Sequence, residues 1–428
     1  MSASQLAIEG GTPVRTEPLP SSDSISGRMM GDEEIKNLTE VIHSGHLFRY
    51  GGKFVVGFEQ EFAKRYGMKH AVASTSGTAA LHVAMGALRT NPGDEVIVSP
   101  ITDMGGIIPV LFQGAIPIFA DLEPDMYCMQ PESIAENITD RTAAIIVVHL
   151  LGQTADMDPI LEIARSKGIK VIEDCAQAYL TEYHGQLAGT VGDFGCFSLQ
   201  QSKHMTAGDG GITITNDDDL AANARLFADK GWPRGGEARD YVFLGANYRM
   251  NELTGAVMLA QLRKLDGILA DTRANQHMIL DGIRKIQGIT PRPVNDPEGD
   301  TGICIMFYLD DAEKVPEITA ALQAEGIAAS GRGRIAASTT TTHKNMPDWH
   351  VYDSWDHIIN KGTPTPDGCP YICPLYKGDA PSHYTKSMCP NTLSYLNRTV
   401  HLDIPAQMTK ADCEMVIKGI RKVAAAML

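Results

Sequence analysis

The sequence predicts an α/β domain built on a mostly parallel sheet, followed by a smaller α+β domain. Short apolar runs rich in β-branched residues alternate with segments at helical spacing; the runs are DEVIVSP, AIPIFAD, AAIIVVHL and KVIEDCA. Such alternation is typical of a parallel sheet with helices on both faces. The runs are apolar throughout, as expected for strands buried on both sides.

The first expected helices have recognisable ends. Residues 31–45, GDEEIKNLTEVIHSG, place acids in the first turn and a glycine after the last apolar residue. Residues 79–88, AALHVAMGAL, predict a second helix. The long stretch 259–288 keeps helical spacing and predicts one long helix or two in succession.

The pattern changes after about residue 260. A strand-like run at 302–310 and helical segments at 316–326 and 408–427 indicate an α+β arrangement. We therefore predict a large domain with an N-terminal arm over residues 1–265 and a small C-terminal domain over residues 266–428.

Composition narrows the class of protein. The chain has 428 residues, is 43% hydrophobic and 21% charged, and carries a net charge of −15, which argues against nucleic-acid and anionic-membrane partners. No apolar stretch reaches the ~18 residues of a membrane span. The first residues, MSASQLAIEGGTPVRTEP, lack the basic and apolar regions of a secretory signal. We expect a cytoplasmic protein.

Most of the eight cysteines lie in apolar surroundings, which favours reduced, buried thiols. Cys369, Cys373 and Cys389, together with His383, raise the question of a zinc site. The spacing CPYIC differs from the common C-x-x-C pattern, so we expect no metal ion.

Residues 331–390 have weak periodicity and are rich in Pro, Gly, Thr, His and Trp. Long irregular segments in compact domains are usually functional or mobile. This segment is expected either to line a substrate pocket or to form an exposed loop, and the residues that would line the pocket are Arg332, Arg334, His343, Trp349 and His350.

A first candidate site is STSGTAALHVAM, residues 74–85. Small hydroxyl residues and a glycine lead directly into a helix, where free backbone N–H groups suit a phosphate. The same pattern also occurs as an ordinary helix N-cap. The sequence contains neither a Walker loop nor a G-x-G-x-x-G turn after a strand, which disfavours a nicotinamide oxidoreductase.

Two further candidates are an acid and an amine. Asp174 ends the apolar run of VIEDCAQA, where it caps the next helix or pairs with a protonated ring nitrogen. Lys203, in FGCFSLQQSKHMTAGDGG, is either a surface lysine or an amine that forms an imine. A phosphate seat, a strand-end acid and a lysine 29 residues later together match the needs of pyridoxal phosphate.

Ordered motifs along nearly the whole chain resemble the DegT/DnrJ/StrS family of sugar aminotransferases, which have the fold type I of pyridoxal-phosphate enzymes. The motifs include GGTPVR, FEQEFAKRYGMKHAVASTSGTAALHVA, PGDEVIVSP, VIEDCAQA, GTVGDFGCFSLQQSKHMTAGDGG and GANYRMNELTGAV. The resemblance implies a large domain with a mostly parallel seven-stranded sheet.

The resemblance also implies roles for individual residues. Lys203 would bind the cofactor as an imine and move the proton between cofactor and substrate. Asp174 would pair with the pyridine nitrogen, and Gln177 would contact the ring hydroxyl. The phosphate would be held by Ser198 with the backbone of Gly77 and Thr78, and in the neighbouring subunit by Asn247. The expected assembly is therefore a homodimer or a dimer of dimers.

Two positions need separate comment. A dehydratase subgroup of the family has histidine in place of the lysine, and His204 is adjacent; counting back from GDGG places Lys203 at the family position. Family members often place an aromatic residue over the cofactor ring where SPITDMGG has Asp103. Either Met104 or another side chain covers that ring face, or Asp103 contacts substrate.

The implied reaction transfers an amino group from glutamate or glutamine to a keto sugar. LFRYGG and SLQQSK resemble the branch that aminates free cyclitols such as scyllo-inosose, in antibiotic pathways. Composition favours instead a cell-envelope sugar, such as an 8-amino-3,8-dideoxy-octulosonate of lipopolysaccharide; a nucleotide-linked keto sugar is a further alternative. Some proteins of this fold are regulators or binding proteins, but the lysine and aspartate retained here favour an enzyme.

Overall fold

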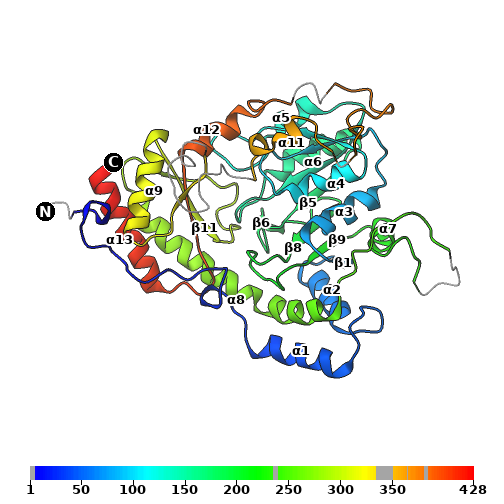
Figure 1. Ribbon diagram of the computed structural model, residues 1–428, viewed down its shortest axis with the longest axis horizontal. Coiled ribbons are helices and arrows are strands. Elements are labelled where there is room, and N and C mark those ends of the chain that lie inside the picture. The colour runs from blue at the N-terminus through cyan, green and yellow to red at the C-terminus, as the bar shows by residue number, and fades with distance from the viewer. Residues whose placement is uncertain (1–4, 235–239, 334–349, 364, 380–383) are drawn as a thin grey trace.

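The computed structural model describes residues 5–234, 240–333, 350–363, 365–379 and 384–428 (Figure 1). Within these residues, seven strands form the main sheet in the order β1-β9-β8-β5-β4-β2-β3. Only β9 runs antiparallel to its neighbours, so the prediction of a mostly parallel sheet is confirmed. The strands are β1 (His70–Ser74), β2 (Glu95–Val98), β3 (Ile116–Phe119), β4 (Thr142–Val148), β5 (Lys170–Asp174), β8 (Phe194–Ser198) and β9 (Gly211–Thr215).

Helices cover both faces of this sheet, because the strands carry apolar side chains on both sides. In β1, Val72 belongs to the core under one face, whereas Ala71 and Ala73 belong to the core under the other. The first face is covered by α3 (Gly77–Leu88), α4 (Ile108–Phe112), α5 (Pro131–Asn137), α6 (Met157–Lys167) and α7 (Asp218–Ala228). The second is covered by α2 (Phe54–Arg65) and the first half of α8 (Glu252–Ile283).

A second sheet of four antiparallel strands, in the order β10-β11-β13-β12, forms the small domain. Its strands are β10 (Ile289–Pro291), β11 (Cys304–Leu309), β12 (Ser330–Gly331) and β13 (Thr399–Asp403). Its core also contains side chains of α9 (Val315–Ala324), α13 (Lys410–Met427) and the end of α8. Among the described residues, the remaining α-helices are α1 (Asp32–Ser44), α11 (Asp356–Ile359) and α12 (Pro390–Arg398). The strands β6 (Glu182–Tyr183) and β7 (Gln186–Leu187) form a hairpin.

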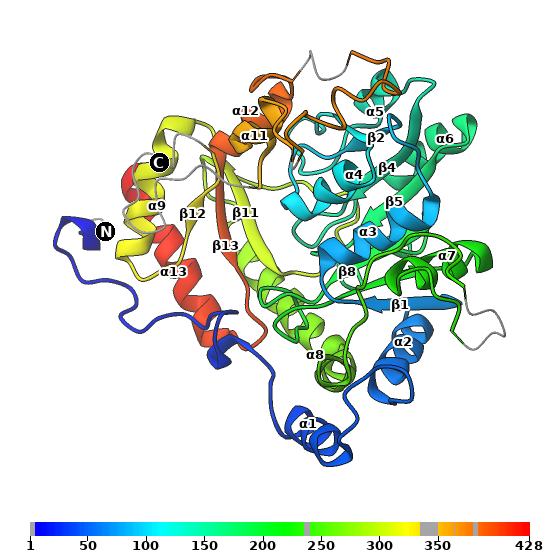
Figure 2. The same cartoon turned by 45° about the vertical axis from the view of Figure 1, so that its right-hand side comes forward.

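The long helical stretch is one continuous helix. α8 has 32 residues and passes from beneath the main sheet to the small domain, where it packs against α13 (Figures 1 and 2). Residue 265, the predicted domain boundary, lies inside α8, so the division 1–265 and 266–428 stays a prediction. The first described residues and the C-terminal helix α13 both lie at the small-domain end of the molecule (Figure 2).

Two predictions from the sequence concern membrane spans and the cysteines. Of the described helices, none combines the length and the apolar character needed to cross a membrane. Cys389 is buried, Cys369 is exposed, Cys373 lies between, and all three are free thiols. His383 lies outside the described residues.

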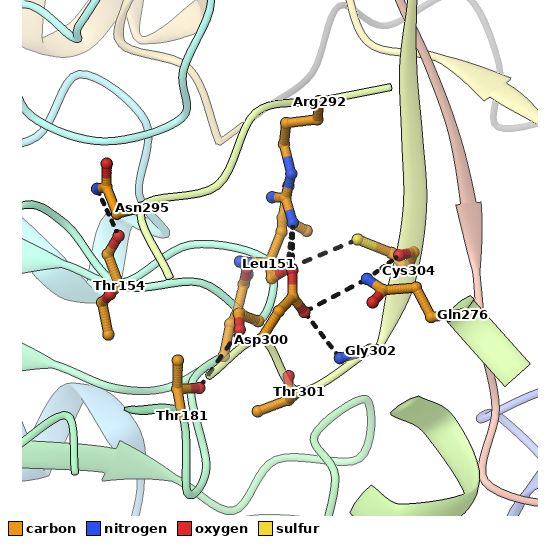
Figure 3. A network of polar contacts seen from close by, with 12 residues as sticks. Leu151, Thr154, Thr181, Gln276, Arg292, Asn295, Asp300, Thr301, Gly302 and Cys304 are labelled. Carbon is orange, nitrogen blue, oxygen red and sulfur yellow. Dashed lines mark hydrogen bonds and ion pairs between the residues drawn. The ribbon is translucent and has the colours of Figure 1, made fainter. Parts of the chain in front are cut away.

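A buried polar network joins the small domain to the loop after β4 (Figure 3). The guanidinium Nη2 of Arg292 donates to the Leu151 carbonyl oxygen at 3.1 Å and to Asp300 Oδ2 at 3.3 Å. Asp300 also accepts the Gly302 N–H at 2.8 Å and the Gln276 side-chain amide at 3.3 Å. Both charged side chains are 4% exposed, so each depends on the other for compensation of its charge.

Removing one member of this pair should destabilise the fold. Asp300→Ala leaves the Arg292 charge buried without its carboxylate, and we expect the free energy of unfolding to fall by about 3–5 kcal/mol. Urea unfolding followed by circular dichroism measures the change. Asp266→Ala, which removes the exposed Arg65–Asp266 pair, is the control and should cost less than about 1 kcal/mol. Equal losses in the two variants would contradict the role given to the Arg292–Asp300 pair.

Candidate active site

Apart from Asn247, the predicted site residues lie at or just after the carboxyl ends of β5 and β8 and at the start of α3. Ligands of open α/β sheets bind at this edge. A cavity of about 360 Å³ opens there, and Gln177 and Lys203 are among its lining residues. A more open cavity of about 700 Å³ lies between α8 and the segment before α13, but none of the predicted site residues lines it.

Lys203 lies on the loop between β8 and β9. Its backbone is held by a turn bond from Lys203 N to the Gln200 carbonyl at 2.9 Å and by the buried Arg28, which donates to the carbonyls of Gln201 and Lys203. Burial lowers the pKa of the Lys203 amine, and the nearby Asp174 and Asp103 carboxylates oppose that change. A lowered pKa increases the neutral fraction of the amine, which is the form that attacks a carbonyl group.

Asp174 ends β5 and is 6% exposed. Its carboxylate accepts the Ala176 N–H at 3.0 Å. Burial raises the pKa of Asp174, whereas this hydrogen bond and the Lys203 charge lower it. Gln177 lies three residues later and accepts the Leu151 N–H on its side-chain oxygen at 2.9 Å. The network of Arg292 and Asp300 therefore supports the loop that orients Gln177.

Glu173 and His149 form a buried pair behind Asp174 that the sequence analysis did not single out. The Glu173 carboxylate accepts three backbone N–H groups of the 189–192 turn at 2.7–3.0 Å and contacts His149 Nε2 at 2.9 Å. The other ring nitrogen of His149 accepts the Ala155 N–H at 3.1 Å, and the His149 backbone donates to the Asp174 carbonyl at 3.0 Å. This pair fixes the strand end that carries Asp174. The acid next to Asp174 in VIEDCAQA is the sequence feature that could have pointed to this pair.

The same pair, with Cys175, places three ligand-type atoms within 4.8 Å of one another. The hydrogen bonds of His149 and Glu173 already occupy both imidazole nitrogens and both carboxylate oxygens. Burial also raises the pKa of the Cys175 thiol well above its usual value, which disfavours the thiolate that a metal requires. The cluster is therefore best explained as a structural network.

The start of α3 has the features of an anion site. Ser76 caps the helix by accepting the Ala79 N–H at 3.0 Å, so the N–H groups of Gly77 and Thr78 precede the capped position. Gly77 packs directly against Ser198: a Cβ at Gly77 would lie 2.6 Å from Ser198 Cβ. Two backbone donors and a hydroxyl thus converge at a helix N-terminus, which suits a phosphate group.

Asn247 lies apart from this cluster, on the exposed segment before α8. It forms an isolated backbone bridge with Asp229. The next residue, Tyr248, places its hydroxyl 2.8 Å from His82 Nδ1, and Arg249 pairs with the Asp229 carboxylate. The predicted contact of Asn247 with the phosphate of a neighbouring subunit stays a prediction.

His204 and Asp103 take different positions around Lys203. The His204 ring packs on Tyr179, with ring centroids 5.3 Å apart, and burial lowers the pKa of His204 to about 3. A neutral histidine there is consistent with Lys203 as the reactive residue. Asp103 caps a short turn by accepting the Gly105 N–H at 2.7 Å and pairs with His350 at 3.2 Å.

The segment 331–390 contributes to the cavity in part. Arg332 and His350 line it. Arg334, His343 and Trp349 lie outside the described residues.

Comparison with known proteins assigns the family. Residues 28–340 match the model of the DegT/DnrJ/EryC1/StrS aminotransferase family. The chain belongs to this family. It is a pyridoxal-phosphate-dependent transaminase of fold type I, as the sequence analysis expected. An anion seat, a strand-end carboxylate and a buried amine are the groups that this cofactor requires, so the residues present fit it.

Three similar proteins illustrate the range of the family. The chain is 35% identical over 351 residues to the L-glutamine:2-deoxy-scyllo-inosose aminotransferase of Streptomyces kanamyceticus, covering 76% of this chain and 79% of that protein. It is 44% identical over 221 residues to the GDP-perosamine synthase of Caulobacter vibrioides, covering 51% and 59%. Among solved structures, DesV of S. venezuelae in complex with a ketimine intermediate superposes with a TM-score of 0.75 at 27% identity, covering 92% of this chain and 94% of that one.

A methyl group at Gly77 tests the anion seat. In Gly77→Ala the added carbon would meet Ser198 at 2.6 Å and force α3 away from β8, at a cost of about 1–3 kcal/mol. We expect the affinity for pyridoxal phosphate, measured by fluorescence titration of the apoprotein, to fall about tenfold or more.

Gly57→Ala in α2 is the matched control. A methyl there meets Leu259 at an ordinary 3.5 Å and lies in a different helix, so cofactor affinity should not change. Wild-type affinity in Gly77→Ala would exclude this helix start from the phosphate site.

Proposed function

We propose that this transaminase converts a keto sugar, or the related ketone of a cyclitol, into the corresponding amine with L-glutamate or L-glutamine as donor. The observation that carries the proposal is the meeting of Lys203 and Asp174 beside the Gly77–Ser198 seat. Pyridoxal phosphate supplies an electron sink for the electrons released when the donor loses its α-proton.

The protein residues have separate tasks in this proposal. Ser198 and the N–H groups of Gly77 and Thr78 bind the phosphate, and Gln177 contacts the ring hydroxyl. Asp174 would keep the ring nitrogen of the cofactor protonated, because a negative charge nearby stabilises that proton. Lys203 would move the proton between the carbon of the bound substrate and the carbon of the cofactor, first as general base and then as general acid.

The acceptor that we propose is a free keto sugar carrying an acid group, such as the keto precursor of an 8-amino-3,8-dideoxy-octulosonate for lipopolysaccharide. The cavity supports this: among its described lining residues, Arg28, Arg332, His350 and His401 provide cationic or potentially cationic groups, whereas Asp403 is the single acid. A site rich in such groups favours an anionic ligand.

The relatives support two other acceptor classes. The similarity to a 2-deoxy-scyllo-inosose aminotransferase supports a neutral cyclitol ketone, and the similarity to GDP-perosamine synthase supports a nucleotide-linked sugar. We further propose that the enzyme acts in the cytoplasm as a homodimer or a dimer of dimers, in which Asn247 completes the phosphate site of the neighbouring subunit.

Replacing the lysine tests the reaction. Lys203→Ala should abolish transamination and the visible absorption band of the lysine-bound cofactor, because no other amine is expected to replace it. The far-UV circular dichroism spectrum should remain that of the wild type. Lys64→Ala, at an exposed position of α2, should keep both activity and absorption. Transamination by Lys203→Ala would refute the assignment.

An acceptor panel tests the substrate class. The holoenzyme is mixed with glutamate or glutamine and, in turn, an 8-keto octulosonate, scyllo-inosose and a nucleotide-linked keto sugar, and aminated product is measured by mass spectrometry. We expect the octulosonate to be aminated with the highest kcat/KM. Absence of amination of the octulosonate excludes it, and turnover of scyllo-inosose alone establishes the cyclitol alternative.

A further inference from the structure

The loop after β2 is paired with a segment that lies about 250 residues later in the chain. Ile101 and Val351 form an antiparallel bridge, Thr102 N donates to the His350 carbonyl at 2.9 Å, and Tyr352 N donates to the Pro100 carbonyl at 2.9 Å. These backbone bonds fix the position of His350 relative to the strand end. The irregular segment between β12 and β13 thus brings the His350 imidazole to the edge of the main sheet.

The His350 side chain is oriented by Asp103. His350 Nε2 lies 3.2 Å from Asp103 Oδ2, while the other oxygen of Asp103 accepts the Gly105 N–H at 2.7 Å. One carboxylate therefore fixes both its own loop and the imidazole ring. The hydrogen bond to His350 also lowers the pKa of Asp103.

The Asp103 loop and His350 border the two ends of the cofactor site. At one end, a Cβ at Gly105 would meet Thr78 Oγ1 at 2.4 Å and Asp103 Oδ1 at 3.0 Å, so the Asp103 loop borders the phosphate seat. At the other end, His350 lines the same cavity as Lys203 and Gln177. The charge of Asp103 also influences the pKa of both Lys203 and Asp174.

We propose that His350, held by Asp103, covers the open face of the cofactor's pyridine ring and stacks on it. The inference rests on the cofactor site proposed above. A flat, aromatic side chain is favourable against a pyridine ring, and Asp103 itself offers no such surface. The small-domain segment thereby supplies the ring contact that the loop after β2 does not.

The experiment measures the dissociation constant of pyridoxal phosphate from the apoprotein by fluorescence titration. His350→Ala should raise it about 3- to 10-fold, the contribution of one stacked ring pair. His350→Phe keeps a flat ring and should stay close to the wild type. Adding Asp103→Phe to His350→Ala should restore affinity, because the new phenyl ring would approach the same face of the cofactor from the loop after β2.

A control separates stacking from anchoring of the segment. Tyr352→Phe removes the hydroxyl that donates to the Lys386 carbonyl at 2.9 Å and accepts the Cys389 N–H at 3.1 Å, while His350 remains. We expect wild-type cofactor affinity. A loss equal to that of His350→Ala would mean that His350 only anchors the segment, and would overturn the proposal.

Two other outcomes also overturn it: unchanged affinity in His350→Ala, or a rise confined to the KM of the acceptor. If the wild-type apoprotein binds no pyridoxal phosphate, the cofactor site itself fails. The stacking proposal alone fails, and the cofactor site stands, if three results occur together. The wild type binds pyridoxal phosphate, Lys203→Ala loses the visible absorption band, and His350→Ala has the cofactor affinity of the wild type.

Discussion

The proposed cofactor site depends on one constraint: the Asp174 carboxylate has to keep its charge at the buried end of β5, where burial has the largest effect on its pKa. Burial alone raises the pKa of Asp174, so neighbouring groups must favour the ionised form. The Ala176 N–H and the Lys203 amine do so directly. Glu173 and His149 act through the backbone, because they fix the strand end from which the side chain projects.

Support for the site continues into the small domain. Gln177 is oriented by Leu151, whose carbonyl is held by Arg292, which is paired in turn with Asp300 (Figure 3). The continuous helix α8 contributes side chains to the cores under both sheets and so connects the two parts of the molecule. His350 arrives at the site from the same part of the chain. The large sheet thus carries the proposed reactive groups, while contacts from the small domain hold the loop that orients Gln177.

Some features were predictable because local sequence specifies them. Strands buried on both sides are apolar throughout, and Asp174 and Lys203 follow such runs at the strand ends where ligands bind. The seat at Gly77 was visible as a glycine opening a helix. His350, in contrast, was one of five candidates in an irregular segment, and Arg28 was not noticed, because their contacts cross long stretches of chain.

The sequence by itself determined the fold class, the family and the residues at the strand ends, since periodicity and local motifs encode these. Only the tertiary structure decided that the predicted helical stretch is one helix as far as Ile283, that Glu173 pairs with His149, and that Asp103 meets His350. A contact between residues 103 and 350 depends on how the 350–352 segment pairs with the loop after β2. That pairing follows from the packing of the whole chain, which no local pattern records.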